Sequence, residues 1–317
     1  YARYRFDSKS NTTGRTGTTG FGEVKEADTA NTHRFTSDID FKAAIDDNFF
    51  GVIGFRYDSV DYSGERSNVA TRVGVDDMGE DWFGQTFNVR QFYLGYTAGN
   101  TTLMAGRQVL GTFFTDDMVG TGIKLLNSDI SGLTLVGMAF DNLQDDSDIG
   151  LSGVILGDKT VSVDPKTGAV SGKPEYVTDR NLYGVAAIGS YDPVSFQLWY
   201  AALDSVAQLY ALDVTVGANL GDVDLSLQAQ AAGSSMWADN ADAFVAGWPK
   251  PVALDDATFL AVELGAKAFG FDGSVGYVNL NTQGDGISLI SLEDQGGFIT
   301  AGEDLLDYTL FNYDANI

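Results

Sequence analysis

The chain has 317 residues, with 19 Lys and Arg against 44 Asp and Glu, which gives a formal charge of −25. This negative surplus repels nucleic-acid phosphates, and the absence of Cys excludes disulfide scaffolds, thiolate metal sites and cysteine nucleophiles. No stretch approaches the roughly 18 apolar residues that a membrane-spanning helix needs. The 38 Gly, 5 Pro and 12% aromatic residues indicate many strands with Gly-rich connections.

Segments of about ten residues in which apolar and polar residues alternate predict β-strands. In residues 34–43, Phe35, Ile39 and Phe41 fall on one face, whereas Asp38 and Asp40 fall on the other. A helix would scatter these side chains around its circumference. Strict or looser alternation predicts thirteen strands, at 2–7, 34–43, 49–59, 87–97, 101–110, 120–127, 133–141, 181–191, 194–203, 207–217, 222–231, 257–269 and 273–281, with a candidate fourteenth within 307–314.

Short and long connections alternate between these strands. The short turns are 45–48, 98–100, 128–132, 192–193, 219–221 and 270–272, and the long loops are 8–32, 60–85, 111–119, 142–180, 233–256 and 282–306. Only the short link at 204–206 breaks the alternation. Long loops at one end and tight turns at the other predict an up-and-down antiparallel barrel.

Strand length and aromatic placement favour a membrane barrel. A bilayer needs about 9–11 residues per tilted strand, whereas strands in soluble sandwiches commonly have about 5–6. Aromatic residues flank the tight turns, as Phe41 and Phe49, Tyr191 and Phe196, and Phe269 and Phe271 do. Such rings suit a membrane–water girdle, although a soluble β-protein with an aromatic core would show the same placement.

Several long blocks resemble the major outer membrane protein porins of Campylobacter and its epsilonproteobacterial relatives. They are NVRQFYLGYTAGNTTLMAGRQVL (88–110), FTDDMVGTGIKLLNSDISGLTL (114–135), NLYGVAAIGSYD (181–192), FQLWYAALDSVAQLYALD (196–213) and LEDQGGFITAGED (292–304). The resemblance implies an all-β transmembrane barrel of the bacterial outer membrane, usually a homotrimer, surrounded by lipid and lipopolysaccharide. It also implies a general diffusion porin for ions and small hydrophilic solutes that is not an enzyme and requires no cofactor.

Members of this family should begin upstream of Tyr1 and end in an aromatic residue after a last strand. We therefore expect residues 1–317 to be one barrel domain that is truncated at both ends, within a protein of about 16–18 strands. An open barrel edge in lipid would leave backbone groups unpaired.

The resemblance also implies a constriction, because porins of this type fold the loop that corresponds to 111–119 into the lumen. The candidate acidic constriction residues are Asp116, Asp117, Asp146, Asp148, Glu293 and Asp294. The alternative is that these acids are solvated loop charges. Converging carboxylates at Asp117, Asp148 and Glu293 could hold Ca²⁺, since hard cations prefer oxygen ligands.

A basic wall opposite the acids would create a transverse field across the pore. Its candidate residues are Arg3, Arg5, Arg34, Arg56, Arg107 and Lys124. Arg3, Arg5 and Arg34 could instead neutralise nearby aspartates in a structural ladder. Arg90 and Arg107 are in phase with apolar neighbours, which leaves a bulge or a buried subunit contact as alternatives.

The excess of acids predicts a preference for cations over anions. The rival function is a secreted or surface all-β adhesion protein with an acidic exterior. An outer-membrane barrel enzyme is less consistent with the sequence, because His33 is its only histidine and no Gly-x-Ser-x-Gly elbow accompanies it.

Overall fold

The computed structural model of the chain describes residues 2–10, 29–63, 82–115, 117–144, 154–156, 162–163, 170–171, 175–237, 243–245, 252–283, 288–289, 297–299 and 315–316. The chain forms two compact units. Unit 1 consists of residues 1–43 and 51–92, and unit 2 consists of residues 44–50 and 93–317.

Long antiparallel strands make up most of the described residues. They are β1 (Ala2–Ser10), β2 (Thr29–Ala44), β3 (Phe49–Ser63), β4 (Trp82–Ala98), β5 (Thr101–Val109), β6 (Val119–Asn127), β7 (Leu133–Asp141), β12 (Leu182–Tyr191), β13 (Val194–Leu203), β14 (Ala207–Asn219), β15 (Val223–Met236), β18 (Ala257–Ala268) and β19 (Phe271–Thr282). The two-residue strand β20 (Ala315–Asn316) pairs with β19. All thirteen predicted strands are confirmed, and 307–314 lies outside the described residues.

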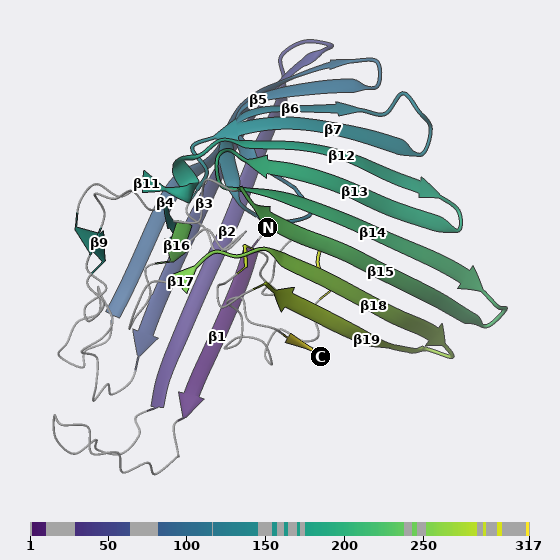
Figure 1. Cartoon of the computed structure of the whole chain (residues 1–317). Helices are drawn as coiled ribbons and strands as arrows, with labels where there is room; N and C mark the ends of the chain where they lie inside the picture. Colours follow the sequence, from purple (N-terminus) through teal and green to yellow (C-terminus); the bar gives the residue numbers. More distant parts are fainter. Residues whose placement is uncertain are drawn as a thin grey trace. The chain divides into compact units, whose positions relative to one another are not determined.

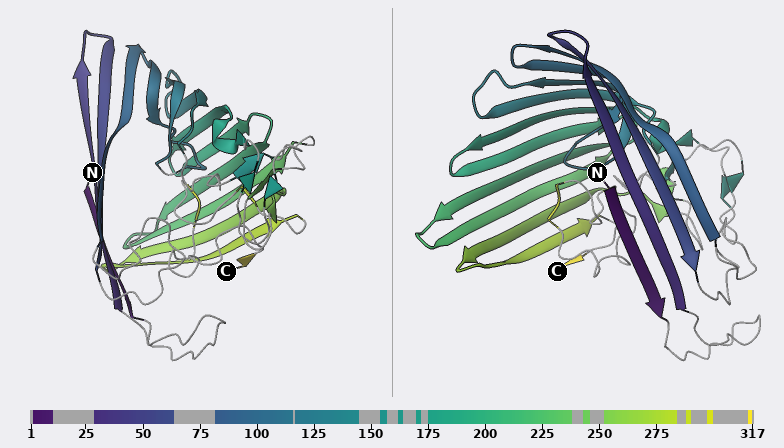
Figure 2. Two further views of the ribbon diagram at one scale, coloured as in Figure 1. Left: turned by 90° about the vertical axis from the view of Figure 1, so that its left-hand side faces the viewer. Right: turned by 180° about the vertical axis from the view of Figure 1, so that it is seen from behind.

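These strands hydrogen-bond in the order in which they occur along the chain, β1-β2-β3-β4-β5-β6-β7-β12-β13-β14-β15-β18-β19-β20. Tight turns explain the pairings across them, such as that of β12 with β13, since a strand that follows a turn of a few residues pairs antiparallel with the strand before it. Figures 1 and 2 show β12, β13, β14, β15, β18 and β19 of unit 2 side by side, seen from the front and from behind.

The long connections contain short strands that the periodicity does not predict. They are β8 (Val154–Leu156), β9 (Ser162–Val163), β10 (Val170–Ser171), β11 (Glu175–Tyr176), β16 (Ala243–Val245) and β17 (Val252–Ala253), and a 3₁₀ turn spans Val177–Asp179. Four of the six form a small sheet in the order β11-β8-β16-β17. The predicted loops 142–180 and 233–256 are therefore joined by strand pairing, because β8 belongs to the first loop and β16 to the second.

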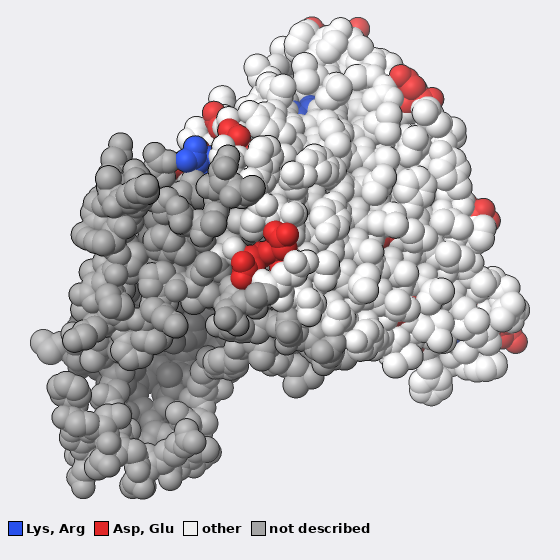
Figure 3. Space-filling view, viewed as in Figure 1, with Lys and Arg blue, Asp and Glu red and all other residues white. Residues whose placement is uncertain are grey.

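The sheet of unit 2 has an exposed face and a covered face. Along β14, Tyr210, Leu212 and Val216 are exposed, whereas Leu209 and Asp213 are buried. The exposed face carries large apolar side chains on β12, β13, β14, β15, β18 and β19: Tyr183, Val185, Leu198, Tyr200, Tyr210, Leu212, Val216, Leu227, Leu260, Val262, Leu264, Val275 and Tyr277. The part of this unit seen in Figure 3 is almost uncharged, with acidic side chains mainly near the strand ends.

The aromatic residues beside the tight turns are exposed as well. Phe269 and Phe271 are 81% and 82% exposed, and Tyr191 and Phe49 are nearly half exposed. Their exposure means that they do not contribute to a buried core in the described structure, which removes the soluble-core interpretation of these rings. Among the described residues, no helix is long and apolar enough to cross a bilayer.

Candidate functional site

On the covered face of unit 2, the strand register aligns residues of like chemistry across seven strands. One row is entirely apolar and buried, and we call it the apolar band: Val136, Ala186, Trp199, Ala211, Ala232, Phe259 and Leu280. The alternation of the sequence predicts a hydrophilic inner face. That prediction is wrong for this row, because a loop covers it and removes it from water.

Toward the tight turns, the covered face becomes polar on the strands from β7 to β15 that lie in the middle of the sheet. We call these residues the polar band: Thr134, Ser190, Ser195, Gln197, Asp213, Thr215, Gln228 and Gln230. Most of them line a cavity of about 370 Å³. Asp213 is 8% exposed, and each of its carboxylate oxygens lies 3.1 Å from Gln228 Nε2. The polar band therefore offers hydroxyl, amide and carboxylate groups to a small polar solute.

The connection between β5 and β6 covers the apolar band. The two ends of this connection meet where the Leu110 N–H donates to the Met118 carbonyl at 2.9 Å, and we call this point its neck. Gly111 has φ +62°, which a residue with a side chain rarely adopts. Two hydroxyl groups stabilise the turn that follows. Thr112 Oγ1 lies 2.9 Å from Thr115 Oγ1 and accepts the Phe114 N–H at 3.1 Å.

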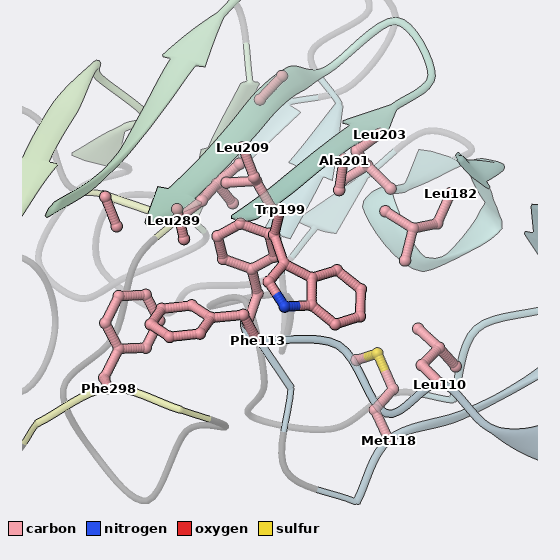
Figure 4. Packing of buried hydrophobic residues seen from close by; sticks show 14 of the residues in the cluster. Leu110, Phe113, Met118, Leu182, Trp199, Ala201, Leu203, Leu209, Leu289 and Phe298 are labelled. Atoms are coloured by element: carbon pink, nitrogen blue, oxygen red, sulfur yellow. The ribbon is translucent and has the colours of Figure 1, made fainter. Parts of the chain in front are cut away.

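Aromatic rings fasten this connection to the sheet. Phe113 packs edge-on against Phe298 with ring centroids 4.7 Å apart, and Phe298 packs against Phe259 of the apolar band at 4.9 Å. Phe113 and Phe114 are each 2% exposed and Trp199 is 3% exposed. Figure 4 shows Phe113, Trp199 and Phe298 converging from the connection, from β13 and from a segment near residue 298. The predicted loop 111–119 thus packs on the covered face of the sheet.

The same connection receives a second segment, Gly297–Ile299. The Gly297 N–H donates to the Phe113 carbonyl at 2.9 Å. On the sheet side, Gln230 Nε2 donates to the Gly297 carbonyl at 2.6 Å, and Gln230 Oε1 accepts the Ile299 N–H at 2.7 Å. Sequence reasoning missed Gln230 and Phe298, since no local pattern links residues 67 or more positions apart.

Lys124 is a predicted basic residue on the covered face. Its Nζ donates to the Val109 carbonyl at 2.7 Å and lies 5.9 Å from the centroid of the Phe140 ring. A Cβ atom on Gly111 would lie 3.7 Å from this nitrogen. The ammonium group therefore sits at the neck of the β5–β6 connection.

In unit 1, Arg56 is paired with an acid on the neighbouring strand. Asp38 is 9% exposed and accepts two hydrogen bonds of 2.8 Å from Arg56. Arg90 Nη1 lies 3.2 Å from the same carboxylate. This fork geometry satisfies a buried charge and fixes β2 against β3 and β4.

A bulge in β4 explains the phase of Arg90. Residues on one face of a regular strand are an even number of positions apart. Val89 and Phe92 are both exposed although they are three positions apart, which indicates one extra residue between them. Consecutive residues Arg90 and Gln91 both reach acids of β2, Arg90 to Asp38 and Gln91 Nε2 to Asp40 at 3.1 Å. Two neighbouring residues on one side of a strand define a β-bulge.

Arg107 does not share the covered face. The register pairs it with Thr121, in phase with the exposed residues Leu103 and Ile123, and its Nη2 lies 3.5 Å from Gln144 Oε1. The covered face of β5 instead carries Gln108, which is 2% exposed. Arg107 therefore does not line the same surface as Lys124.

The remaining predicted residues are only partly described. Asp117 is half-buried between the buried Thr115 and Met118. Arg3, Arg5 and Arg34 lie on β1 and β2, where Arg5 pairs with Arg34 in register, and their side chains are outside the described structure. Asp116, Asp146, Asp148, Glu293 and Asp294 lie outside the described residues. Within the described part of the chain, no group of three or more acidic or histidine side chains is placed to hold a metal ion.

The sheet is an antiparallel meander whose exposed face carries apolar side chains. A loop packs against its other face, which carries the apolar band and the polar band. This is the architecture of an outer-membrane porin. Solved porins share the fold. Pseudomonas aeruginosa OccK7 (OpdD) matches with a TM-score of 0.55 and 12% identity over 100% of this chain and 73% of its own. Acinetobacter baumannii OccAB3 matches with a TM-score of 0.53 and 12% identity over 99% of this chain and 72% of its own.

The chain belongs to the Campylobacter major outer membrane protein family, whose model matches residues 1–316. It is therefore a protein of the bacterial outer membrane, and its family is a family of porins rather than enzymes. The chain spans 64% of the length of Pseudomonas aeruginosa OpdK, which covers 88% of this chain at 12% identity with a TM-score of 0.47. Comparison with curated proteins finds no match.

Proposed function

We propose that the protein is a general diffusion porin that passes ions and small hydrophilic solutes and prefers cations. The observation that supports this most strongly is the covered face of unit 2, where the β5–β6 connection packs on the apolar band beside the polar band. In a barrel of this fold the covered face lines the lumen and the exposed apolar face meets lipid. The connection then narrows the lumen and leaves the polar band to contact water and solute.

Charge supports the cation preference. The chain carries 44 acidic residues against 19 Lys and Arg. On the covered face Asp213 lies in the cavity of the polar band, whereas the Lys124 ammonium is bonded to the Val109 carbonyl beneath the loop. A cation in the lumen therefore passes the Asp213 carboxylate, which favours it over an anion.

Recordings of the full-length protein in a planar bilayer test this function. We expect stepwise single-channel conductance and, in a KCl gradient, a reversal potential of the sign that cation flow produces. A protein that inserts without conducting would contradict a porin, and a reversal potential of the opposite sign would contradict the cation preference.

We further propose a homotrimer and a Ca²⁺ ion held by Asp117, Asp148 and Glu293. Both rest on the resemblance to the family, and the sheltered position of Asp117 supports the ion. Native mass measurement in detergent tests the trimer, and a monomeric mass would contradict it. Isothermal titration with Ca²⁺ tests the ion, and heats equal to those of buffer alone would contradict it.

A further inference from the structure

Gln230 holds a segment of backbone against the sheet as another strand would. Its amide donates through Nε2 to the Gly297 carbonyl and accepts through Oε1 from the Ile299 N–H, at 2.6 and 2.7 Å. A primary amide is the side-chain group that offers a donor and an acceptor in the geometry of a peptide bond. The side chain is 3% exposed, so both bonds form where water does not compete.

Phe298 lies between these two bonds and projects into the aromatic cluster. It is 9% exposed and contacts Phe113 and Phe114 of the β5–β6 connection as well as Phe259 of β18, with ring centroids 4.7, 6.3 and 4.9 Å apart respectively. The edge-on pairs with Phe113 and Phe259 are favourable beyond the area that they bury. Phe298 therefore contacts both the loop and the wall of the sheet.

Gly297 joins the segment directly to the loop. Its N–H donates to the Phe113 carbonyl at 2.9 Å, and a Cβ at this position would be 2.6 Å from the Phe113 ring. Only a residue without a side chain allows this approach without a shift of the ring. The segment thus contacts the sheet through Gln230 and the β5–β6 connection through Gly297 and Phe298.

We infer that Gln230 is a positioning residue that joins Gly297–Ile299 and Leu110–Met118 into one constriction. This inference rests on the proposed porin function. The pore width is then set by two connections that are far apart in the sequence, and release of the Gly297–Ile299 segment from Gln230 widens the pore. Gln230 acts through the segment that it holds.

Two readouts separate this inference from the transport function itself. The first is the labelling rate of Ile299→Cys by a water-soluble thiol reagent, which is specific because the chain has no other cysteine. The second is single-channel conductance. Both are measured in a Gln230→Leu background and in a Gln208→Leu background. Gln208 is a matched control on the opposite face of the sheet, where it accepts a bond from Tyr200.

We expect Gln230→Leu to accelerate labelling of Ile299→Cys at least about fivefold, the factor for one lost hydrogen bond, and to raise conductance. Gln208→Leu should change neither. Gly297 lies outside the strands, so Gly297→Ala should leave the sheet intact even if Gln230→Leu impairs folding. It should likewise accelerate labelling and raise conductance. Equal labelling rates in all three backgrounds would overturn the inference. Accelerated labelling with no conductance in any variant would retain the docking and overturn the porin function.

Discussion

The Lys124 ammonium and the Val109 carbonyl are joined by a hydrogen bond of 2.7 Å across the neck of the β5–β6 connection. Val109 is the last residue of β5, and Leu110 begins the connection that packs on the apolar band. A lysine that points into a porin lumen would ordinarily be expected to act as a pore charge. Here its position makes it part of the support of the loop as well as a fixed positive charge.

Replacement of Lys124 by Met keeps the apolar stem and removes the donor. The Val109 carbonyl then loses the hydrogen bond from Lys124, and a bond of this kind with a charged group is worth about 1.5–3 kcal/mol. We expect noisier single-channel currents and a reversal potential shifted further toward cation selectivity. Lys124→Arg keeps the charge and should retain the wild-type selectivity. An unchanged reversal potential in Lys124→Met would contradict an electrostatic contribution of Lys124.

Replacement of Phe113 by Ala should release the β5–β6 connection. Phe113 is 2% exposed and contacts Phe114 and Phe298, and truncation of a buried Phe typically costs about 3–5 kcal/mol. We expect a larger single-channel conductance with the barrel intact, as judged by its resistance to unfolding in detergent. The matched control is Phe271→Ala, whose ring is 82% exposed. Identical conductance in the two variants would argue against the loop as the constriction.

Replacement of Asp213 by Asn should lower the cation preference while it keeps the shape of the side chain. A unit charge about 6 Å from a passing ion in water changes its energy by roughly 0.7 kcal/mol, which is roughly threefold in local concentration. We expect a reversal potential closer to zero in a KCl gradient. Asp272→Asn, at the β18–β19 turn, removes an exposed acid and should have a smaller effect. If the two variants shift the potential equally, Asp213 has no special place in the ion path.

The turn between β2 and β3 should respond to acid. Asp46 Oδ1 accepts the N–H groups of Asn48 and Phe49, both at 2.8 Å, and these bonds hold the pKa of the carboxyl below its ordinary value of 3.8. A lowered pKa means that the stabilisation is complete above the ordinary value and is lost as pH falls through the lowered one. We expect the Asn48 and Phe49 amide resonances to titrate with a midpoint below 3.8 and to be insensitive to pH in Asp46→Asn. A midpoint at or above 3.8 would contradict these bonds.

Alternation along the chain predicts the strands because each long strand has one face in apolar surroundings. It fails at the apolar band, where Trp199 and Phe259 are buried on the side that alternation marks as polar. A signal for this was present in residues 198–203, LWYAAL, which are apolar on both faces. Strands that are apolar on both faces indicate that something covers the inner one.

Other features have no local signal at all. The short strands β8 and β16 have three residues each, too few for a period to be recognised. The Gln230 contacts and the pairing of Arg56 with Asp38 depend on which strands become neighbours. The bulge at Arg90 and Gln91 changes the phase of β4 partway along, so a strict period of two assigns half of that strand to the wrong face.

Thiol labelling of two adjacent residues tests the account most directly. Thr215 belongs to the polar band, and Val216, the next residue of β14, is 37% exposed on the opposite face. With Thr215→Cys in a planar bilayer, a charged water-soluble thiol reagent should change the conductance in discrete steps. With Val216→Cys it should leave the conductance unchanged, because lipid covers that side chain. A response of Val216→Cys but not of Thr215→Cys would show that water fills the other side of the sheet and would contradict the assignment of its two faces.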